Sequence, residues 1–383
     1  MVAPPMLLLL LLAAQSAGAQ DDWEQRLTTA IYQHAAVSSS AFAVAGTSLS
    51  QPLEAELFEV FSGNQSFVTV ADTNPQDHDT VFDVDIAREG TAAVAIQSAR
   101  GNFSSYLFKF DAAGGELDWS TTLNKTELVA VKISNDGSVI AVIGFGNMSY
   151  YEPPNLALWL YDGASGKEHE EAFTNIPSSS VSNAGLSLSG DGSYAAFTSS
   201  EVTGTGRATK ILEYVHVVEI SSGKKHRHEM EDWGSDESSA DRFTAISTDG
   251  VWLACGASSD IHIYKRTGKG DAMTYDFYTV IGITPGTSSF FLDGNPALSF
   301  GGGADSGTSV LAAGWINVFH PRNGVAVTAW ALDASAPTGT APALLVNYSL
   351  PLDDDVREQQ STHQQLTAVL PAFVSYSCVS CPP

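Results

Sequence analysis

The chain alternates short apolar runs with polar turns, and the clearest copy of this pattern lies at residues 133–142. The turn SNDGS at 134–138 separates an apolar run that ends at Ile133 from one that begins at Val139. An Asp-Gly pair supplies the positive φ that a tight turn between antiparallel strands requires. Related stretches return at 188–197 and 246–255. The pattern therefore predicts β-hairpins that recur along the chain.

Each hairpin belongs to a longer unit of four expected strands. In the unit that begins at residue 128, strands are expected at 128–133, 139–143 and 156–161, followed by the turn 164–167 and a strand that ends at 173. Comparable units begin near residues 41, 82, 185, 242 and 288. Residues 27–37 fit a strand or a short helix, and the apolar runs 343–348 and 366–376 give an incomplete seventh unit.

The apolar runs are short and β-rich, and Gly, Ser, Asp and Asn separate them, which favours an all-β protein. A four-stranded antiparallel meander has two apolar faces, and stacking such meanders in a closed ring buries both. The fold expected is a β-propeller of four-stranded antiparallel blades. Seven blades are favoured and six are the alternative. A β-solenoid or two β-sandwiches are the competing all-β arrangements.

Two segments carry a family resemblance. The segment FKFDAAGGELDW at 108–119 resembles the tryptophan-docking repeat of quinoproteins, and LYDGASGK at 160–167 resembles the third strand and turn of a propeller blade. The pattern over 42–332 is similar to the WD40-like and quinoprotein (PQQ)-like repeat propellers. The Trp-Asp and Gly-His signatures of WD40 blades are missing, and only Trp119 completes a docking repeat, echoed at 325–330. The resemblance implies a fold and no specific activity.

The amino-terminal residues 1–19 fit a secretory signal peptide. An apolar run at 6–14 precedes small residues at 17–19, and the run is shorter than the roughly 20 residues that span a bilayer. We expect cleavage near Ala19, a single propeller domain over 20–377 and a cysteine-containing tail over 378–383. A short uncleaved anchor and a mitochondrial presequence are the alternatives. No basic residue precedes Arg26, so the basic start of a signal peptide is missing, and a mitochondrial presequence would be Arg-rich. No later segment has the length and hydropathy of a membrane span.

Further features agree with secretion. Five N-x-Ser/Thr sequons predict N-glycosylation in a eukaryotic host, at Asn64, Asn102, Asn124, Asn147 and Asn347. Cys378 and Cys381 predict a local disulfide in an oxidising compartment, with free or intermolecular thiols as the alternative. Cys255 lies in an apolar strand pattern and is expected to be a buried, inert thiol.

The formal net charge of −25 argues against binding to nucleic acid or to anionic membranes. It suits a soluble extracellular protein, or one that meets cations or basic partners. We expect a secreted scaffold that binds a protein or a glycan. The alternative is an enzyme that uses the central funnel, either a quinoprotein-like oxidoreductase or a propeller hydrolase or lyase. A structural role in a wall or matrix, with self-association, is a third hypothesis.

The sequence offers weak candidates for site chemistry. His226 and His228 share one face of an expected strand and, with His216, suggest a metal site, but KKHRHE at 224–229 fits a solvated, charged edge better. EHEE at 168–171 has the same interpretation. The run Asp353–Asp355 lacks the spacing of a calcium loop, and Gly301–Gly303 lacks the residues of a phosphate loop. A quinone would require docking tryptophans in most blades. We predict no catalytic residue, metal or cofactor.

Overall fold

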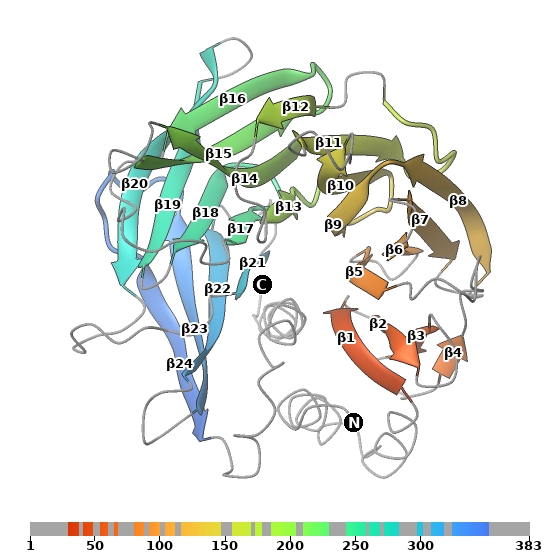
Figure 1. Ribbon diagram of the computed structural model, residues 1–383. Coiled ribbons are helices and arrows are strands. Elements are labelled where there is room, and N and C mark those ends of the chain that lie inside the picture. The colour runs from red at the N-terminus through yellow and green to blue at the C-terminus, as the bar shows by residue number, and fades with distance from the viewer. Residues whose placement is uncertain are drawn as a thin grey trace.

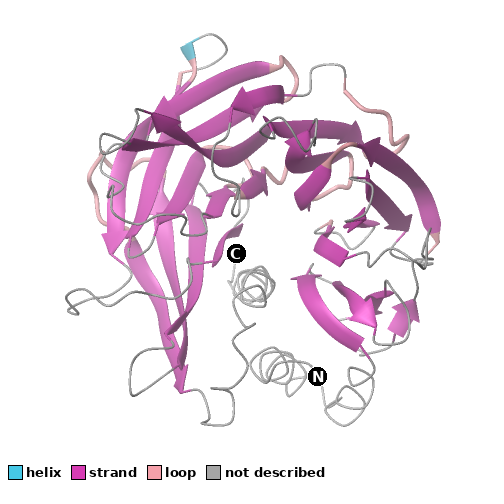
Figure 2. Cartoon of the chain, in the orientation of Figure 1, coloured by secondary structure: helices cyan, strands magenta, loops and turns pink. Residues whose placement is uncertain are grey.

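The computed structural model describes somewhat more than half of the chain, and most of this part is strand (Figure 2). Figure 1 shows the strands as six sheets placed around a common centre. The all-β prediction is confirmed. The described residues are 30–37, 41–48, 54–59, 65–67, 80–87, 92–99, 104–111, 116–146, 155–169, 173–177, 185–203, 210–229, 243–257, 260–268, 272–282, 297–301, 308–317 and 324–351.

Each sheet has four antiparallel strands that follow one another in chain order. The first sheet comprises β1 (Ala30–Val37), β2 (Ala41–Ser48), β3 (Glu54–Glu59) and β4 (Gln65–Phe67). The second comprises β5 (Thr80–Ile86), β6 (Ala92–Ala99), β7 (Ser104–Asp111) and β8 (Leu117–Asn124). The third comprises β9 (Glu127–Ile133), β10 (Val139–Gly146), β11 (Asn155–Asp162) and β12 (Phe173–Pro177).

The remaining sheets repeat this order. The fourth comprises β13 (Leu186–Leu188), β14 (Tyr194–Thr203), β15 (Lys210–Glu219) and β16 (Lys224–Glu229). The fifth comprises β17 (Phe243–Ile246), β18 (Trp252–Ala257), β19 (Asp260–Thr267) and β20 (Thr274–Gly282). The sixth comprises β21 (Ala297–Gly301), β22 (Thr308–Asn317), β23 (Gly324–Asp333) and β24 (Ala343–Pro351).

The first strand of each sheet lies innermost. β1 contacts β5, β5 contacts β9, β9 contacts β13, β13 contacts β17, and β17 contacts β21. The fourth strands, such as β8, β16 and β24, lie at the rim (Figure 1). Repetition of one meander around a centre is the architecture that the recurring hairpins predict.

Burial along the strands explains why the hairpins are easy to recognise in the sequence. Every residue of β10 and β11 is buried except the two end residues of each strand, because neighbouring sheets cover both faces. A strand covered on both faces is a continuous apolar run. The rim strand β8 instead alternates exposed and half-buried residues along most of its length. Apolar layers fill the spaces between the described sheets, for example the layer containing Leu128, Val142 and Trp159.

The structure decides one open detail of the expected units and corrects two. Of the strand and the short helix expected within 27–37, the described residues form the strand β1. The run 343–348 belongs to β24, the fourth strand of the sixth sheet, and not to a seventh unit. The sixth sheet begins with β21, after the Asp-Gly pair at 293–294, because the alternating residues ALSFG form the strand. The run 366–376 lies outside the described residues, so a seventh blade remains a prediction.

Candidate functional site

The turn at 134–138 is held by its own side chains. Ser134 Oγ donates to Asp136 Oδ1 at 2.8 Å, and the same carboxylate oxygen accepts the Ser138 N–H at 3.0 Å. Ser134 Oγ also accepts the Val139 N–H at 3.0 Å, and Gly137 has a φ of 76°. Partial burial opposes the effect, but the hydrogen bonds lower the pKa of Asp136 below its ordinary value. The turns 189–194 and 247–252 repeat these three contacts at 2.7 to 3.0 Å.

These turns are joined from sheet to sheet. The Asn135 N–H donates to the Gly190 carbonyl at 2.8 Å, and the Asp191 N–H donates to the Thr248 carbonyl at 3.0 Å. Residues 134–138, 189–193 and 247–251 therefore form one continuous strip, here named the turn row. Its glycines Gly137, Gly192 and Gly250 are buried, while Asp136 and Asp191 are exposed. The turn row presents carboxylates at positions fixed by backbone hydrogen bonds.

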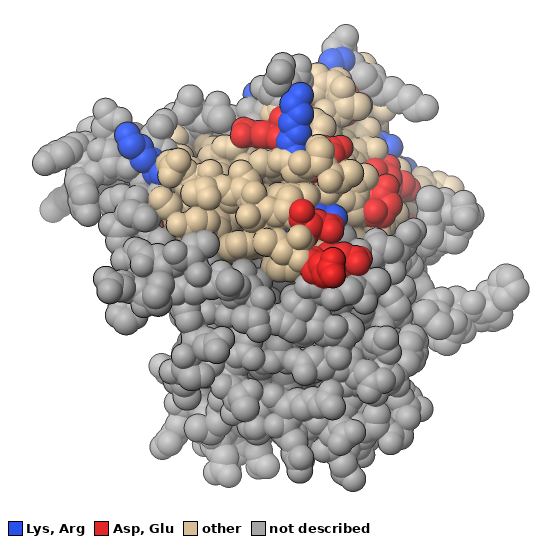
Figure 3. Space-filling model, turned by 90° about the vertical axis from the view of Figure 1, so that its right-hand side faces the viewer, with Lys and Arg blue, Asp and Glu red and all other residues tan. Residues whose placement is uncertain are grey.

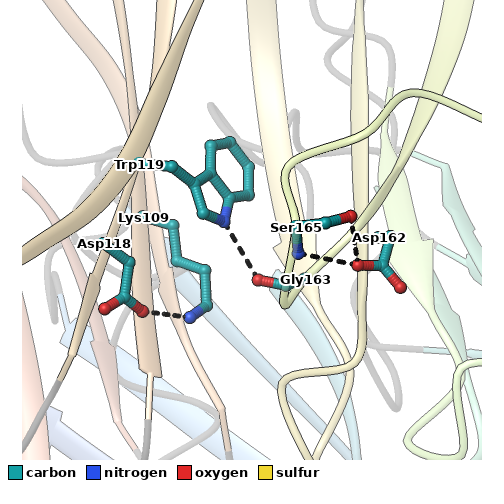
Figure 4. Close-up of polar contacts among 6 residues, drawn as sticks. All are labelled: Lys109, Asp118, Trp119, Asp162, Gly163 and Ser165. Carbon is teal, nitrogen blue, oxygen red and sulfur yellow. Dashed lines mark hydrogen bonds and ion pairs between the residues drawn. The ribbon is translucent and has the colours of Figure 1, made fainter.

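Trp119 on β8 joins the second sheet to the third (Figure 4). Its Nε1–H donates to the Gly163 carbonyl at 3.0 Å, and its ring covers Gly166, where a Cβ would lie 2.7 Å from the ring. The Gly163 N–H in turn donates to the Ser138 carbonyl at 2.7 Å, which ties the docking contact to the turn row. Beside the indole, Lys109 pairs with Asp118. Trp119 therefore has the docking role that its segment predicts.

We expect Trp119→Phe to destabilise the protein by about 1 kcal/mol, because it removes one hydrogen bond and keeps an aromatic ring. Trp119→Ala should cost roughly 2 to 3 kcal/mol, since it also leaves the half-buried ring site empty. Urea unfolding followed by circular dichroism measures both values. Equal losses for the two variants would contradict a separate contribution from the hydrogen bond.

A charged cluster joins the innermost strands of the second and third sheets. Asp83 Oδ2 accepts the Val131 N–H at 3.0 Å, and Asp85 Oδ2 accepts the Ile133 N–H at 2.9 Å. Lys132 Nζ lies 3.7 Å from Asp83 Oδ2 and 4.0 Å from Asp85 Oδ1. Burial alone would lower the pKa of Lys132, but the two carboxylates raise it above its ordinary value. The sequence signal for this cluster is an Asp-x-Asp repeat on an innermost strand, which we did not anticipate.

We expect Lys132→Met to destabilise the protein by about 2 kcal/mol, because two half-buried carboxylates then face each other without a cation. The double variant Asp83→Asn, Lys132→Met should regain part of this loss. Chemical unfolding of both variants at pH 7 provides the test. A double variant no more stable than Lys132→Met would show that the loss does not arise from carboxylate repulsion.

The side chain of His216 on β15 is titratable and is buried within the fourth sheet. Its Nε2 lies 2.8 Å from Ser199 Oγ, and its ring stacks on Phe197 with the centroids 4.8 Å apart. Burial, with a smaller contribution from the Arg227 charge, lowers the pKa of His216 from 6.5 to about 4. The ring is therefore neutral at physiological pH, and it contributes hydrogen bonding and packing.

The suggested metal site is not formed. In the β15–β16 register His216 lies opposite Arg227, so it shares the face of Arg227, whereas His226 and His228 project from the other face. His228 packs against the ring edge of Tyr264, with centroids 5.2 Å apart. Within the described ranges, no three His, Cys, Asp or Glu side chains gather as metal ligands. The sequence pattern could not show that a neighbouring strand places His216 on the opposite face.

No protein-family model matches the sequence, and no curated protein is similar to it. Solved structures do match. The chain is 12% identical to a crystal structure of RRP9 WD40 repeats over 85% of this chain and 82% of that one, with a TM-score of 0.52. It is 12% identical to U3-55K over 85% and 83% of the two chains, with a TM-score of 0.51. The fold is that of a β-propeller.

Another match is hydrazine synthase of Kuenenia stuttgartiensis, at 18% identity and a TM-score of 0.45. It covers 61% of this chain and 64% of that chain, so this propeller spans less than two thirds of the hydrazine synthase chain. The activity of the propeller is therefore argued from its own residues.

The structure describes only some of the other residues that the sequence singles out. Cys255 in the fifth blade is fully buried, and burial raises the pKa of its thiol, so it is inert as predicted. Glu168 is exposed and forms an isolated bridge with Tyr161, ahead of the rim strand β12. Gly301 ends β21. The residues that lie outside the described part are the expected signal segment 1–19, Gly302, Gly303, Glu170, Glu171, the run 353–355, Cys378 and Cys381.

Two of the five sequons fall in the described part of the chain. Asn124 is exposed at the end of β8, where Lys125 adopts a φ of 55° and Thr126 Oγ1 donates to the Leu123 carbonyl at 2.7 Å. Asn347 lies within β24. Asn64, Asn102 and Asn147 lie outside the described residues. Glycosylation at all five asparagines stays a prediction. No described helix has the length and apolar character to cross a bilayer.

Proposed function

We propose that this protein is a secreted scaffold whose propeller binds a protein partner outside the cell. The observation that carries the proposal is the coupling of consecutive blades through the turn row and Trp119. Such coupling fixes exposed groups in a defined geometry, so little conformational entropy is lost when a partner binds. A rigid frame that presents exposed turns is a general arrangement for recognition.

The titratable groups clustered between and within the blades have structural roles, which favours binding over catalysis. Asp83 and Asp85 bind backbone N–H groups and Lys132, and Asp136 holds a turn. His216 is buried and neutral. None of these groups combines exposure with a neighbour that would activate it as a nucleophile or a base.

Secretion rests on the leader-like residues 1–19, the five sequons and the strong acidity of the chain. The exposure of Asn124 at the end of β8 supports an accessible acceptor there. A net charge of −25 keeps such a protein soluble. The alternative is that the same scaffold binds a glycan in place of a protein.

The test is cross-linking of the tagged protein in the extracellular medium of cells that express it, followed by mass spectrometry and reconstitution. We expect a polypeptide that cross-links to described surface lysines and binds the purified propeller with fixed stoichiometry. Heat-unfolded protein serves as the control. The proposal fails if no captured polypeptide rebinds, or if only carbohydrate is retained.

A further inference from the structure

The rim strand β16 of the fourth blade has an unusual composition. Among the described strands, β16 forms an edge of its sheet and pairs with β15. Five of its six residues are basic or histidine, namely Lys224, Lys225, His226, Arg227 and His228. This concentration lies in a chain that has only 18 Lys and Arg in 383 residues.

Positive charge often protects an edge strand against unwanted pairing, and the other rim strands test that explanation. β4, β8, β12, β20 and β24 contain no Lys, Arg or His. The rim of the fifth and sixth blades even exposes apolar side chains, with Phe277 49% and Leu344 58% exposed. On the side that includes β8, both acidic and basic side chains lie among the uncharged described residues (Figure 3). Positive charge on the rim strand is therefore not the general edge protection of this propeller, and β16 calls for another explanation.

Aromatic neighbours hold the cationic side chains of β16 in place. The Arg227 guanidinium lies 3.4 Å from the centroid of the Tyr214 ring, a cation–π contact. His228 contacts the edge of the Tyr264 ring. Lys225 and Arg227 are both exposed and, two residues apart, project from the same face of the strand. At this edge, the main-chain N–H and C=O groups of the outermost strand β16 therefore lie beside the positively charged side chains of Lys225 and Arg227.

We propose that the edge of β16 binds an acidic, extended segment of the protein partner by strand addition. Main-chain hydrogen bonds along an open sheet edge supply affinity, and alternate side chains supply specificity. Asp or Glu at alternate positions of the added strand would lie near Lys225 and Arg227, as in favourable cross-strand pairs. This inference rests on the proposed function and names the chemistry of the partner segment.

The test uses the intact secreted protein and synthetic peptides in fluorescence anisotropy at physiological salt. The probe alternates Glu with Val over eight residues, and its controls are a Lys-Val peptide and an all-Glu peptide. We expect saturable binding of the Glu-Val peptide alone, and hydrogen exchange slowed at β16 amides when it is bound. The double variant Lys225→Glu, Arg227→Glu should bind at least about tenfold more weakly. The matched variant Lys167→Glu, at an exposed turn of the third blade, should bind as the wild type does.

Three results would overturn the inference. These are equal weakening by Lys167→Glu, equal binding of the all-Glu peptide without amide protection, and stronger binding of a sulfated oligosaccharide at the same residues. The charge-reversal variant also separates this inference from the proposed function. If it retains the cross-linked natural partner in full, the β16 site is wrong while the scaffold function stands.

Discussion

The substitution Gly163→Ala is expected to destabilise the protein by about 4 kcal/mol or more. A Cβ at this position would lie 1.9 Å from the Gly137 carbonyl oxygen and 3.1 Å from the Ser138 carbonyl carbon. Both are main-chain atoms of the turn row, so no side chain can move aside to relieve the overlap. Gly163 also bonds Ser138 and Trp119, and displacement would break both contacts.

Gly146→Ala is the matched control in the same blade. There a Cβ would lie 3.7 Å from the Trp159 ring and 4.0 Å from the Asn155 carbonyl oxygen, and both are ordinary contacts. We expect a change within about 1 kcal/mol, with either sign. Chemical unfolding of the two variants and the wild type gives both values. If Gly163→Ala were as stable as Gly146→Ala, the close contact between Gly163 and the Gly137 carbonyl oxygen would be wrong.

Acidification from pH 7 to pH 5 is expected to remove about 2 kcal/mol of stability through His216. Burial lowers the folded-state pKa of His216 from 6.5 to about 4, so the unfolded chain binds the proton more readily. The contribution is therefore present above pH 6.5 and is lost progressively as the pH falls toward 4. Denaturant unfolding at pH 7 and pH 5 measures the difference.

His216→Gln isolates this effect, because glutamine can hydrogen-bond Ser199 and does not titrate. Its stability at pH 7 should be lower than that of the wild type, and its loss between pH 7 and pH 5 should be smaller by about 2 kcal/mol. His169→Gln, at an exposed position, should keep the wild-type pH dependence. An unchanged pH dependence in His216→Gln would show that His216 is not the group that carries it.

The repeated hairpins of the fold were predictable because both strands around each Asp-Gly turn are covered on two faces. Continuous apolar runs such as 139–143 therefore stand out against polar turns. The sixth sheet was less predictable, since its first hairpin has a Gly-rich connection in place of the repeated turn. An Asp-Gly pair just before β21 resembled the missing turn, and the strand was expected too early.

The candidate site was harder to predict than the fold, because it depends on contacts between separate blades. The Trp119 segment indicated a docking contact, yet its acceptor, Gly163, lies in the next blade. The Asp83, Asp85 and Lys132 cluster likewise joins strands from two blades. Hydrophobic periodicity reports which face of a strand is buried, and it does not report which neighbour covers it.

Native mass spectrometry of the protein purified from extracellular medium tests most directly whether this propeller is a secreted protein-binding scaffold. We predict a chain that begins near Gln20, carries glycans, and retains a second polypeptide at fixed stoichiometry. A chain that retains residues 1–19, or one that carries a stoichiometric metal or redox cofactor in place of a polypeptide partner, would contradict the account. The second result would favour an enzyme that uses the central funnel.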